Sequence, residues 1–290
     1  MATLVGFTAI LMWALLALLT ARTGTVPPLQ LNAMTFAVGT LVGLVAFKAR
    51  GARLSVFRQP VRVWALGVVG LAGYHALYFA ALRNAPAAEA SLIAYLWPLL
   101  IVLGSAMLPG ERLRWFHVAG AILGLLGAGL VITGRAGGLD FSNEAAFGYA
   151  LAGLCALFWT GYSLLSRRFA DVPTDVVTGF CAATAILSAL AHLAFETTVW
   201  PADASQWIAV LLLGLLPVGA AFYTWDHGVK HGDIQLLGAA SYAAPLLSTF
   251  VLILFGEAQA TSTLLLSAAL ITTGAALAAL PLFKRLTRRG

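Results

Sequence analysis

Charged side chains are scarce in this chain. Asp, Glu, Lys and Arg make up 10% of its 290 residues, whereas 61% are hydrophobic and the mean hydropathy is +0.92. No soluble core needs such a composition, and a membrane-spanning helix takes about 20 apolar residues. We therefore predict an all-α integral membrane protein with ten transmembrane helices. The predicted spans cover residues 2–21, 29–47, 61–82, 85–108, 115–133, 147–168, 174–195, 206–226, 233–255 and 262–283.

Cysteines and reactive motifs are equally sparse. The two cysteines, Cys155 and Cys181, lie inside predicted helices and form neither a disulfide framework nor a metal-ligand cluster. The chain has no H-E-x-x-H, no G-x-S-x-G, no nucleotide-binding loop and no pair of mid-membrane aspartates. These absences argue against an enzyme, an ATP-driven pump, a metal site and any cofactor. An intramembrane enzyme or a passive channel, which needs a continuously wet pore, is the alternative from a different functional class.

The basic residues predict the orientation of the chain. With the N-terminus inside the cell, all but three of the 17 Lys and Arg fall on the cytoplasmic side, as the positive-inside rule requires. The three outside are Arg22, Arg83 and Arg135. We therefore expect a bacterial inner-membrane protein with both termini in the cytoplasm. The net charge of +6 lies in loops that contact anionic membrane lipid, so no nucleic-acid partner is expected.

The two halves of the chain repeat each other. Each half holds five predicted spans, an odd number, so the second copy must enter the bilayer from the opposite side. Such inverted repeats are typical of transporters. We predict one five-helix repeat at 1–134 and a second, inverted one at 147–290. Displacements of 146 or 147 residues match Trp13 with Trp159, Arg83 with Lys230, Tyr95 with Tyr242, Pro98 with Pro245, and Gly110-Glu111 with Gly256-Glu257.

Two prolines interrupt equivalent spans. Pro98 and Pro245 both fall near the middle of the membrane, in the fourth and ninth predicted spans. A proline removes a backbone hydrogen bond and kinks a helix. Because matching interruptions in two repeats point to a transporter's binding site, we predict that both prolines act as hinges. Glycines such as Gly120, Gly124 and Gly127 are interpreted as packing positions, with the fifth and tenth spans serving as a brace or a dimer contact.

The aromatic residues divide into two groups by predicted depth. An interfacial belt near helix ends accounts for Trp64, Trp115, Trp200, Trp207, Trp225, Tyr149 and Tyr223. At mid-depth an indole N–H or a phenol O–H needs a partner or a wet cavity, and the residues there are Trp13, Tyr74, Tyr95, Trp97, Trp159, Tyr162 and Tyr242. We predict that this second group shares one internal chamber. The alternative is that these rings fill space and their hydroxyls bond to nearby backbone carbonyls.

Helical spacing extends the predicted chamber to neighbouring polar side chains. The predicted substrate-binding set is Tyr74, His75, Tyr78, Ser91, Tyr95, Trp97, Trp159, Tyr162, Ser163 and Tyr242. All carboxylates lie in loops or near helix ends, and no lysine or arginine lies at mid-depth. Such a chamber suits a net-neutral amphipathic small molecule, whose ammonium group rests on ring faces and whose carboxylate accepts hydroxyl donors.

Histidines are the candidates for proton coupling. His75 lies closest to mid-depth, and a neutral, hydrogen-bonded ring is the favoured interpretation. A second group lies at the inner ends of the eighth and ninth spans. It is interpreted as a solvated loop, with a cytoplasmic gate network as the alternative, and comprises Asp226, His227, Lys230, His231 and Asp233.

Two segments carry a resemblance to a known family. AEASLIAYLWPLLIVLGSAMLPGERL in the fourth span and GDIQLLGAASYAAPLLSTFVLILFGEAQ in the ninth resemble EamA-type carriers of the drug/metabolite transporter superfamily. YLWPLL and GYHALYFAAL are similar to the aromatic amino acid exporters within that group. The resemblance implies export of amino acids from the cytoplasm, along a path lined by helices 3, 4, 8 and 9 and closed by helices 1 and 6. Together with the inverted repeats, the uncharged chamber and the histidines, it leads us to expect export of aromatic and other neutral amino acids by alternating access and facilitated diffusion. A proton-coupled drug or metabolite efflux carrier is the alternative, and the sequence leaves the choice between monomer and dimer open.

Overall fold

The computed structural model describes residues 1–136, 143–256 and 261–278, and these ranges contain helices and no strand. Eight apolar segments are long enough to cross a membrane, and two shorter apolar helices accompany them. The predicted all-α fold is therefore confirmed for the described residues. Glu257, the end of the tenth predicted span and the C-terminal basic residues of the orientation argument lie outside them.

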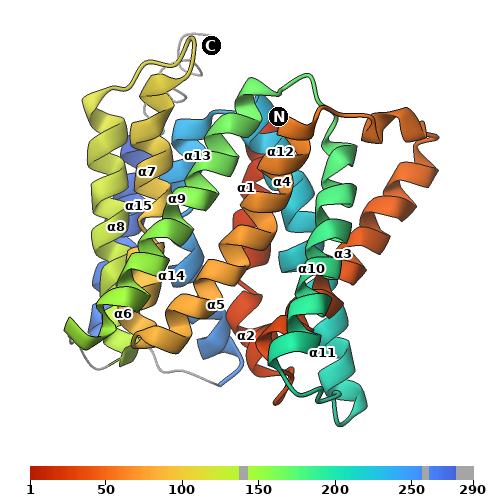
Figure 1. Cartoon of the computed structure of the whole chain (residues 1–290). Helices are drawn as coiled ribbons and strands as arrows, with labels where there is room; N and C mark the ends of the chain where they lie inside the picture. The colour runs from red at the N-terminus through yellow and green to blue at the C-terminus, as the bar shows by residue number, and fades with distance from the viewer. Residues whose placement is uncertain (137–142, 257–260, 279–290) are drawn as a thin grey trace.

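The helices pack side by side in one bundle, with the N-terminus at the upper end in Figure 1. The α-helices are α1 (Ala2–Trp13), α2 (Leu16–Ala21), α3 (Pro28–Ala49), α4 (Val61–Val68), α5 (Tyr74–Asn84), α6 (Ala87–Ala94), α7 (Trp97–Gly104), α8 (Trp115–Ala136), α9 (Ala146–Arg168), α10 (Val177–Phe195), α11 (Ala204–Leu215), α12 (Ala221–His231), α13 (Ile234–Ala240), α14 (Ala243–Leu254) and α15 (Ser262–Ala278).

Local sequence signals set several helix ends. Pro28 is the first residue of α3, where its missing N–H costs nothing. Asp203 and Asp233 cap α11 and α13, each accepting a hydrogen bond from a backbone N–H of the first turn. Gly110 and Gly256 follow the two proline-containing spans with φ of 81° and 75°, a left-handed conformation that favours glycine.

Among the described residues, five spans are interrupted within their length, three between two α-helices and two by a π-helical turn. The first breaks between α1 and α2, the fourth between α6 and α7, and the ninth between α13 and α14. Pro98 lies in the first turn of α7 and Pro245 in the first turn of α14, where a proline is tolerated. The structure thus ends a helix just before each proline. Their action as hinges stays a prediction.

The third and eighth spans each contain a π-helical turn that the sequence did not predict. These turns, Val69–Gly73 and Leu216–Ala220, lie 147 residues apart, the displacement that also matches Tyr95 with Tyr242. A π-helical turn disturbs the regular hydrogen bonding of a helix and often occurs at functional sites. In the second turn the Pro217 carbonyl accepts a hydrogen bond from the Trp13 indole at 3.1 Å.

Glycines bring the fifth and tenth spans together. A methyl group on Gly120 of α8 would lie 2.5 Å from the carbonyl oxygen of Gly274 in α15, so the two backbones are in close contact. Gly127 faces Ile271 of α15 in the same way, and Gly124 makes room for the ring of Tyr242. The interpretation of these glycines as packing positions fits, because α15 covers this face of α8 within the chain.

Candidate substrate-binding site

Four tryptophans from four different spans meet inside the bundle. Trp13 ends α1, Trp97 begins α7, and Trp159 and Trp225 lie within α9 and α12. Every pair among the four has ring centroids 5.1 to 6.2 Å apart. We call these residues the tryptophan cluster. Helix breaks place two of its members, since the chain bends directly after Trp13 and directly before Trp97.

Trp225 was predicted at the membrane interface, and this prediction is wrong. Its side chain is fully buried, and its indole N–H donates to the Ser163 hydroxyl at 3.1 Å. The reason is the length of the eighth span, which extends over Ala204–His231 rather than ending at residue 226. Trp225 therefore lies well inside a helix whose end the hydropathy pattern set too early.

Tyr223 departs from the predicted belt for the same reason. Its hydroxyl donates to the Gly39 carbonyl at 3.0 Å and lies 3.2 Å from the Thr178 hydroxyl, which joins α12 to α3 and α10. The belt interpretation fits other members. Trp115, Trp200 and Trp207 are 71%, 63% and 39% exposed.

Tyrosines surround the tryptophan cluster. The rings of Tyr74 and Tyr162 each lie 5.3 Å from that of Trp159. Tyr78 stacks parallel to Tyr74 at 6.1 Å, and its hydroxyl lies 3.3 Å from the Ser91 hydroxyl. The structure therefore brings these predicted site residues into one connected aromatic group.

Tyr95 and Ser163 also touch this group. The Tyr95 ring lies 6.5 Å from that of Trp97, and Ser163 accepts the Trp225 hydrogen bond. Both follow from the helical breaks and spacing, because Tyr95 lies in the break before α7 and Ser163 lies one turn after Trp159.

His75 lies at the edge of this group, among apolar rings. Its ring is 5.0 Å from Phe36 and 6.1 Å from Phe222, both edge-on, and 5.1 Å from Tyr74. Its Nδ1 donates to the Leu71 carbonyl at 2.8 Å, a bond to its own helix that leaves Nδ1 occupied. The surroundings suit a neutral, hydrogen-bonded imidazole.

Tyr242 lies apart from the tryptophan cluster. It is fully buried in a second core group with Val102, Ala121 and Ala128. Its hydroxyl accepts a hydrogen bond from the Leu99 N–H at 3.1 Å. Tyr242 thus satisfies a free backbone donor in the first turn of α7, rather than lining the same space as the tryptophans.

Asp226 and Lys230 form a buried ion pair, which overturns the interpretation of this segment as a solvated loop. The Lys230 ammonium lies 2.8 Å from the Asp226 carboxylate, with side chains only 3% and 1% exposed. Asp226 also accepts hydrogen bonds from the hydroxyls of Thr174 at 2.8 Å and Tyr162 at 3.4 Å. Lys230 also donates to the Val172 carbonyl at 3.0 Å. The i, i+4 spacing of Asp226 and Lys230 is visible in the sequence, but the eighth span was predicted to end at residue 226, so the burial of the pair was not predicted.

Of the other residues of that group, His231 and Asp233 are exposed as predicted, whereas His227 is partly buried and its ring lies 5.0 Å from that of His231. Close by, Arg167 at the end of α9 donates to the carbonyls of Val229 and Gly232 and pairs with Glu111. The N–H of Asp233 donates to the Thr3 hydroxyl at 3.0 Å. The start of α1 and the ends of α9 and α12 therefore meet at the upper end of the bundle.

Glu196 fastens the lower end. Its carboxylate accepts hydrogen bonds from the N–H groups of Leu29 and Gln30 in the first turn of α3, and it pairs with Arg83 and His192 at 3.0 Å each. Burial raises the pKa of this carboxyl, but these hydrogen bonds and the Arg83 charge more than offset it, so the pKa lies below its ordinary value. A carboxylate at a helix N-terminus is favourable, and this one joins α3, α5 and α10.

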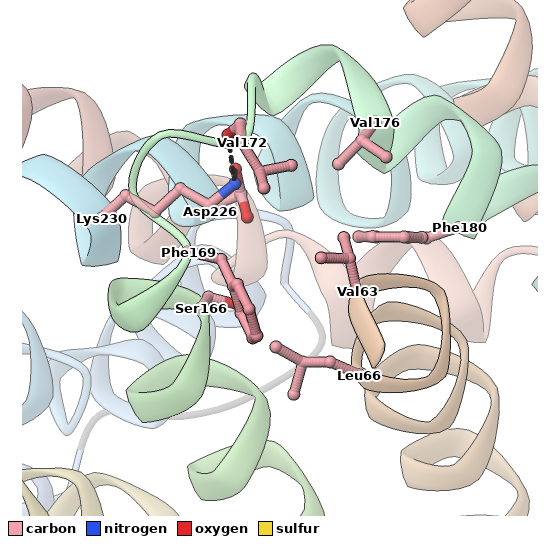
Figure 2. A pocket seen from close by; sticks show the side chains of 9 residues that line it. All are labelled: Val63, Leu66, Ser166, Phe169, Val172, Val176, Phe180, Asp226 and Lys230. Carbon is pink, nitrogen blue, oxygen red and sulfur yellow. Dashed lines mark hydrogen bonds and ion pairs between the residues drawn. The ribbon is translucent and has the colours of Figure 1, made fainter. Parts of the chain in front are cut away.

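A small pocket adjoins the ion pair (Figure 2). Its volume is about 10 Å³, room for roughly one water molecule. Asp226 and Lys230 lie on one side, and Val63 and Leu66 of α4 lie on the other. The pocket therefore separates the third span from the eighth. The remaining lining residues are Ser166, Phe169, Val172, Val176 and Phe180.

Comparison with known proteins identifies the family. The model of the EamA-like transporter family matches residues 1–133 and 146–280. The chain belongs to the EamA-like transporter family. This membership confirms the resemblance drawn from the fourth and ninth spans, and it confirms a multi-pass membrane transporter rather than an enzyme.

Several proteins with assigned functions are similar to this chain. The aromatic amino acid exporter YddG of Ancylobacter novellus is 58% identical over 96% of this chain and 97% of its own. YddG of Salmonella typhimurium is 29% identical over 86% of each chain, and the pseudopaline exporter CntI of Pseudomonas aeruginosa is 31% identical over 78% and 77%. A crystal structure with 58% sequence identity has a TM-score of 0.94 over 98% of both chains.

Proposed function

We propose that this EamA-like protein exports aromatic and other neutral amino acids across the bacterial inner membrane by alternating access. The observation that carries the proposal is the aromatic group built from the tryptophan cluster with Tyr74, Tyr78 and Tyr162. The names of its relatives support the same substrate class, because two of them are aromatic amino acid exporters.

The substrate binds at this aromatic group. Ring faces of tryptophan and tyrosine attract an ammonium group, and they also stack against an aromatic side chain. The hydroxyls of Tyr78 and Ser91, which lie together at one edge, donate to the substrate carboxylate. The predicted site residues Tyr74, Tyr78, Ser91, Tyr95, Trp97 and Trp159 fit this role, whereas Tyr242 supports the break before α7.

Two inverted five-helix repeats move the site between the two sides of the membrane. The paired π-helical turns support this arrangement, as do the paired helix breaks at Tyr95 and Tyr242. The start of α1 lies near the end of α9, so these two equivalent spans run in opposite directions. The breaks before Pro98 and Pro245 provide the hinges.

The upper end of the bundle faces the cytoplasm. Basic residues gather there: Arg50 pairs with Asp175, Arg62 lies 5.5 Å over the Phe169 ring, and Arg167 and Lys230 lie nearby. Arg83 lies at the opposite end with Glu196. This distribution follows the positive-inside rule and supports a cytoplasmic N-terminus.

Transport runs down the gradient of the amino acid itself. His75, the proton-coupling candidate, is held by its own helix and surrounded by Phe36, Phe222 and Tyr74, so a charged ring there has no counter-charge in these contacts. A proton-coupled carrier of drugs or metabolites is the second candidate, and a dependence of uptake on the pH gradient favours it.

Counterflow into proteoliposomes tests the proposal. Vesicles preloaded with unlabelled amino acid receive radiolabelled phenylalanine, methionine or threonine, with and without a pH gradient. We expect saturable exchange that does not depend on the pH gradient. Exchange that requires the gradient returns His75 to a coupling role, and no exchange of any of the three contradicts the substrate class.

A further inference from the structure

We propose that the Asp226–Lys230 pair is a second binding site, which receives a zwitterionic amino acid at the cytoplasmic entrance before it reaches the aromatic group. The ammonium group of the substrate takes the place of Lys230 at the Asp226 carboxylate. The substrate carboxylate takes the place of Asp226 at the Lys230 ammonium. This inference rests on the proposed function and identifies the site at which zwitterionic substrates are selected.

Each charged group of the pair makes at least one further hydrogen bond, which can hold it in the site when the contact between the two groups opens. Asp226 is held by the hydroxyls of Thr174 and Tyr162, and Lys230 by the carbonyl of Val172. These anchors come from α9 and from the segment that joins α9 to α10. When the ion pair opens, both groups stay in place as donor and acceptor for a ligand.

The burial of the pair makes it selective. Because both side chains are almost completely buried, separating them without replacement leaves two unpaired charges out of water, which is strongly unfavourable. A monovalent amine or carboxylate replaces one partner and leaves the other charge unpaired. A zwitterion satisfies both, and its net charge of zero preserves the neutrality of the site.

The adjoining pocket supplies the space. Its apolar wall, formed by Val63 and Leu66 of α4 with Phe180 of α10, lies beside the charges and suits the side chain of a neutral amino acid. The present volume of about 10 Å³ admits no amino acid, so this conformation is closed at the entrance. Movement of α4 away from α12 widens the pocket between these spans, both of which lie on the predicted path.

Tyr162 connects this site to the aromatic group. Its hydroxyl bonds to Asp226, while its ring lies 5.3 Å from Trp159. Trp225, the residue before Asp226, belongs to the tryptophan cluster itself. A substrate leaving the ion pair therefore meets the aromatic group directly.

Single-charge variants test the inference by a change of ligand preference. Phenylalanine counterflow is measured for wild type, Asp226→Asn and Lys230→Gln, with 3-phenylpropionate or 2-phenylethylamine as competitor. We expect Asp226→Asn to become about tenfold more sensitive to the anion 3-phenylpropionate, because Lys230 is left without its counter-charge. We expect Lys230→Gln to become about tenfold more sensitive to the cation 2-phenylethylamine. The reciprocal pattern is the signature, since a merely structural ion pair weakens transport without exchanging the preferences.

Further measurements keep the result decisive. If wild type exchanges phenylalanine and both variants keep the wild-type competitor ratio, the second site is wrong while the proposed function stands. If wild type exchanges no amino acid, both the second site and the proposed function are wrong. Should a single-charge variant fail to give monodisperse protein, the doubly neutral variant Asp226→Asn with Lys230→Gln leaves no unpaired charge. We expect its KM for phenylalanine to rise about tenfold, and an unchanged KM overturns the site.

Discussion

At the scale of single residues, Trp159 is the centre of the proposed binding site. Its ring contacts Tyr74, Tyr162 and Phe222 in addition to the tryptophan cluster. Trp207, by contrast, stacks on Trp200 at the lower end and is 39% exposed. In our proposal the same type of side chain therefore has two roles in one chain, substrate contact at Trp159 and interfacial anchoring at Trp207.

Replacing these two residues tests that division. We expect Trp159→Ala to reduce counterflow by more than about tenfold, which corresponds to at least about 1.4 kcal/mol. Trp207→Ala, the matched control, changes it by less than about twofold. Size-exclusion profiles establish that both variants fold. If the cavity left by the missing indole ring unfolds Trp159→Ala, Trp159→Phe replaces it. Equal losses at both positions contradict the separation of binding site and belt.

The residues that the sequence failed to place share one cause. Trp13, Trp97 and Trp159 lie near the middle of spans whose ends are clear from hydropathy, so their depth could be predicted. Trp225 and Asp226 lie in the part of α12 that continues to His231. The polar residues at the end of α12 have the composition of a loop. Their burial comes from packing against α1, α9 and α10, which composition does not reveal.

At the scale of helices, Pro98 and Pro245 indicated two of the interruptions, whereas neither π-helical turn was predicted, although Pro217 lies in the second one. The Val69–Gly73 turn contains no proline. Tertiary packing accompanies it: a methyl group on Gly70 would lie 2.6 Å from the Tyr162 ring, so α9 packs directly on the backbone of this turn. The sequence alone shows the glycine at position 70, but it does not show that the Tyr162 ring packs against it.

Alanine at Gly70 tests this contact. We expect Gly70→Ala to destabilise the protein by about 1–3 kcal/mol, because the added methyl group forces Tyr162 to shift. Gly161→Ala in α9 is the matched control, since nothing lies within 4 Å of the new methyl group. It gains helix propensity and stabilises by up to about 1 kcal/mol. Thermal unfolding midpoints measure both, and an equal response at the two glycines contradicts the packing argument.

Restoring the backbone donor at a break tests the hinge. Pro98→Ala supplies an N–H that can bond to the Ala94 carbonyl and join α6 to α7 as a continuous helix. We expect the maximal exchange rate to fall by about tenfold with little change in KM, because the residue contacts the moving backbone rather than the substrate. A matched change at Pro245 has the same effect if the two repeats exchange conformations. Unchanged rates in both variants rule out the prolines as hinges.

At the scale of the whole molecule, the two ends are fastened differently. Lys230 and Arg83 are equivalent in the two predicted repeats, yet Lys230 is buried against Asp226 while the Arg83 side chain is 54% exposed beside Glu196. Alternating access requires the two ends to exchange such environments. In the proposed mechanism, a conformation with a buried ion pair at the upper end and a partly exposed pair at the lower end is one of the two states that are exchanged.

Acid titration probes the lower end. Because the pKa of Glu196 lies below its ordinary value in the folded protein, ionised Glu196 adds stability that is fully present above the ordinary carboxyl pKa. That contribution is lost as the pH falls through the lowered folded-state value. Glu196→Gln removes the charge that holds Arg83 and the first turn of α3. We expect a loss of about 1–3 kcal/mol at neutral pH, which shrinks as the pH falls below about 4.

The control uses a second carboxylate that caps a helix. Asp203 caps α11 from an exposed position, and Asp203→Asn keeps the capping oxygen, so its unfolding midpoint stays close to wild type. Midpoints for wild type and both variants, measured from neutral to acid pH, separate the two cases. A Glu196→Gln deficit that persists unchanged at acid pH means that the charge of Glu196 does not hold α3, α5 and α10 together at this end.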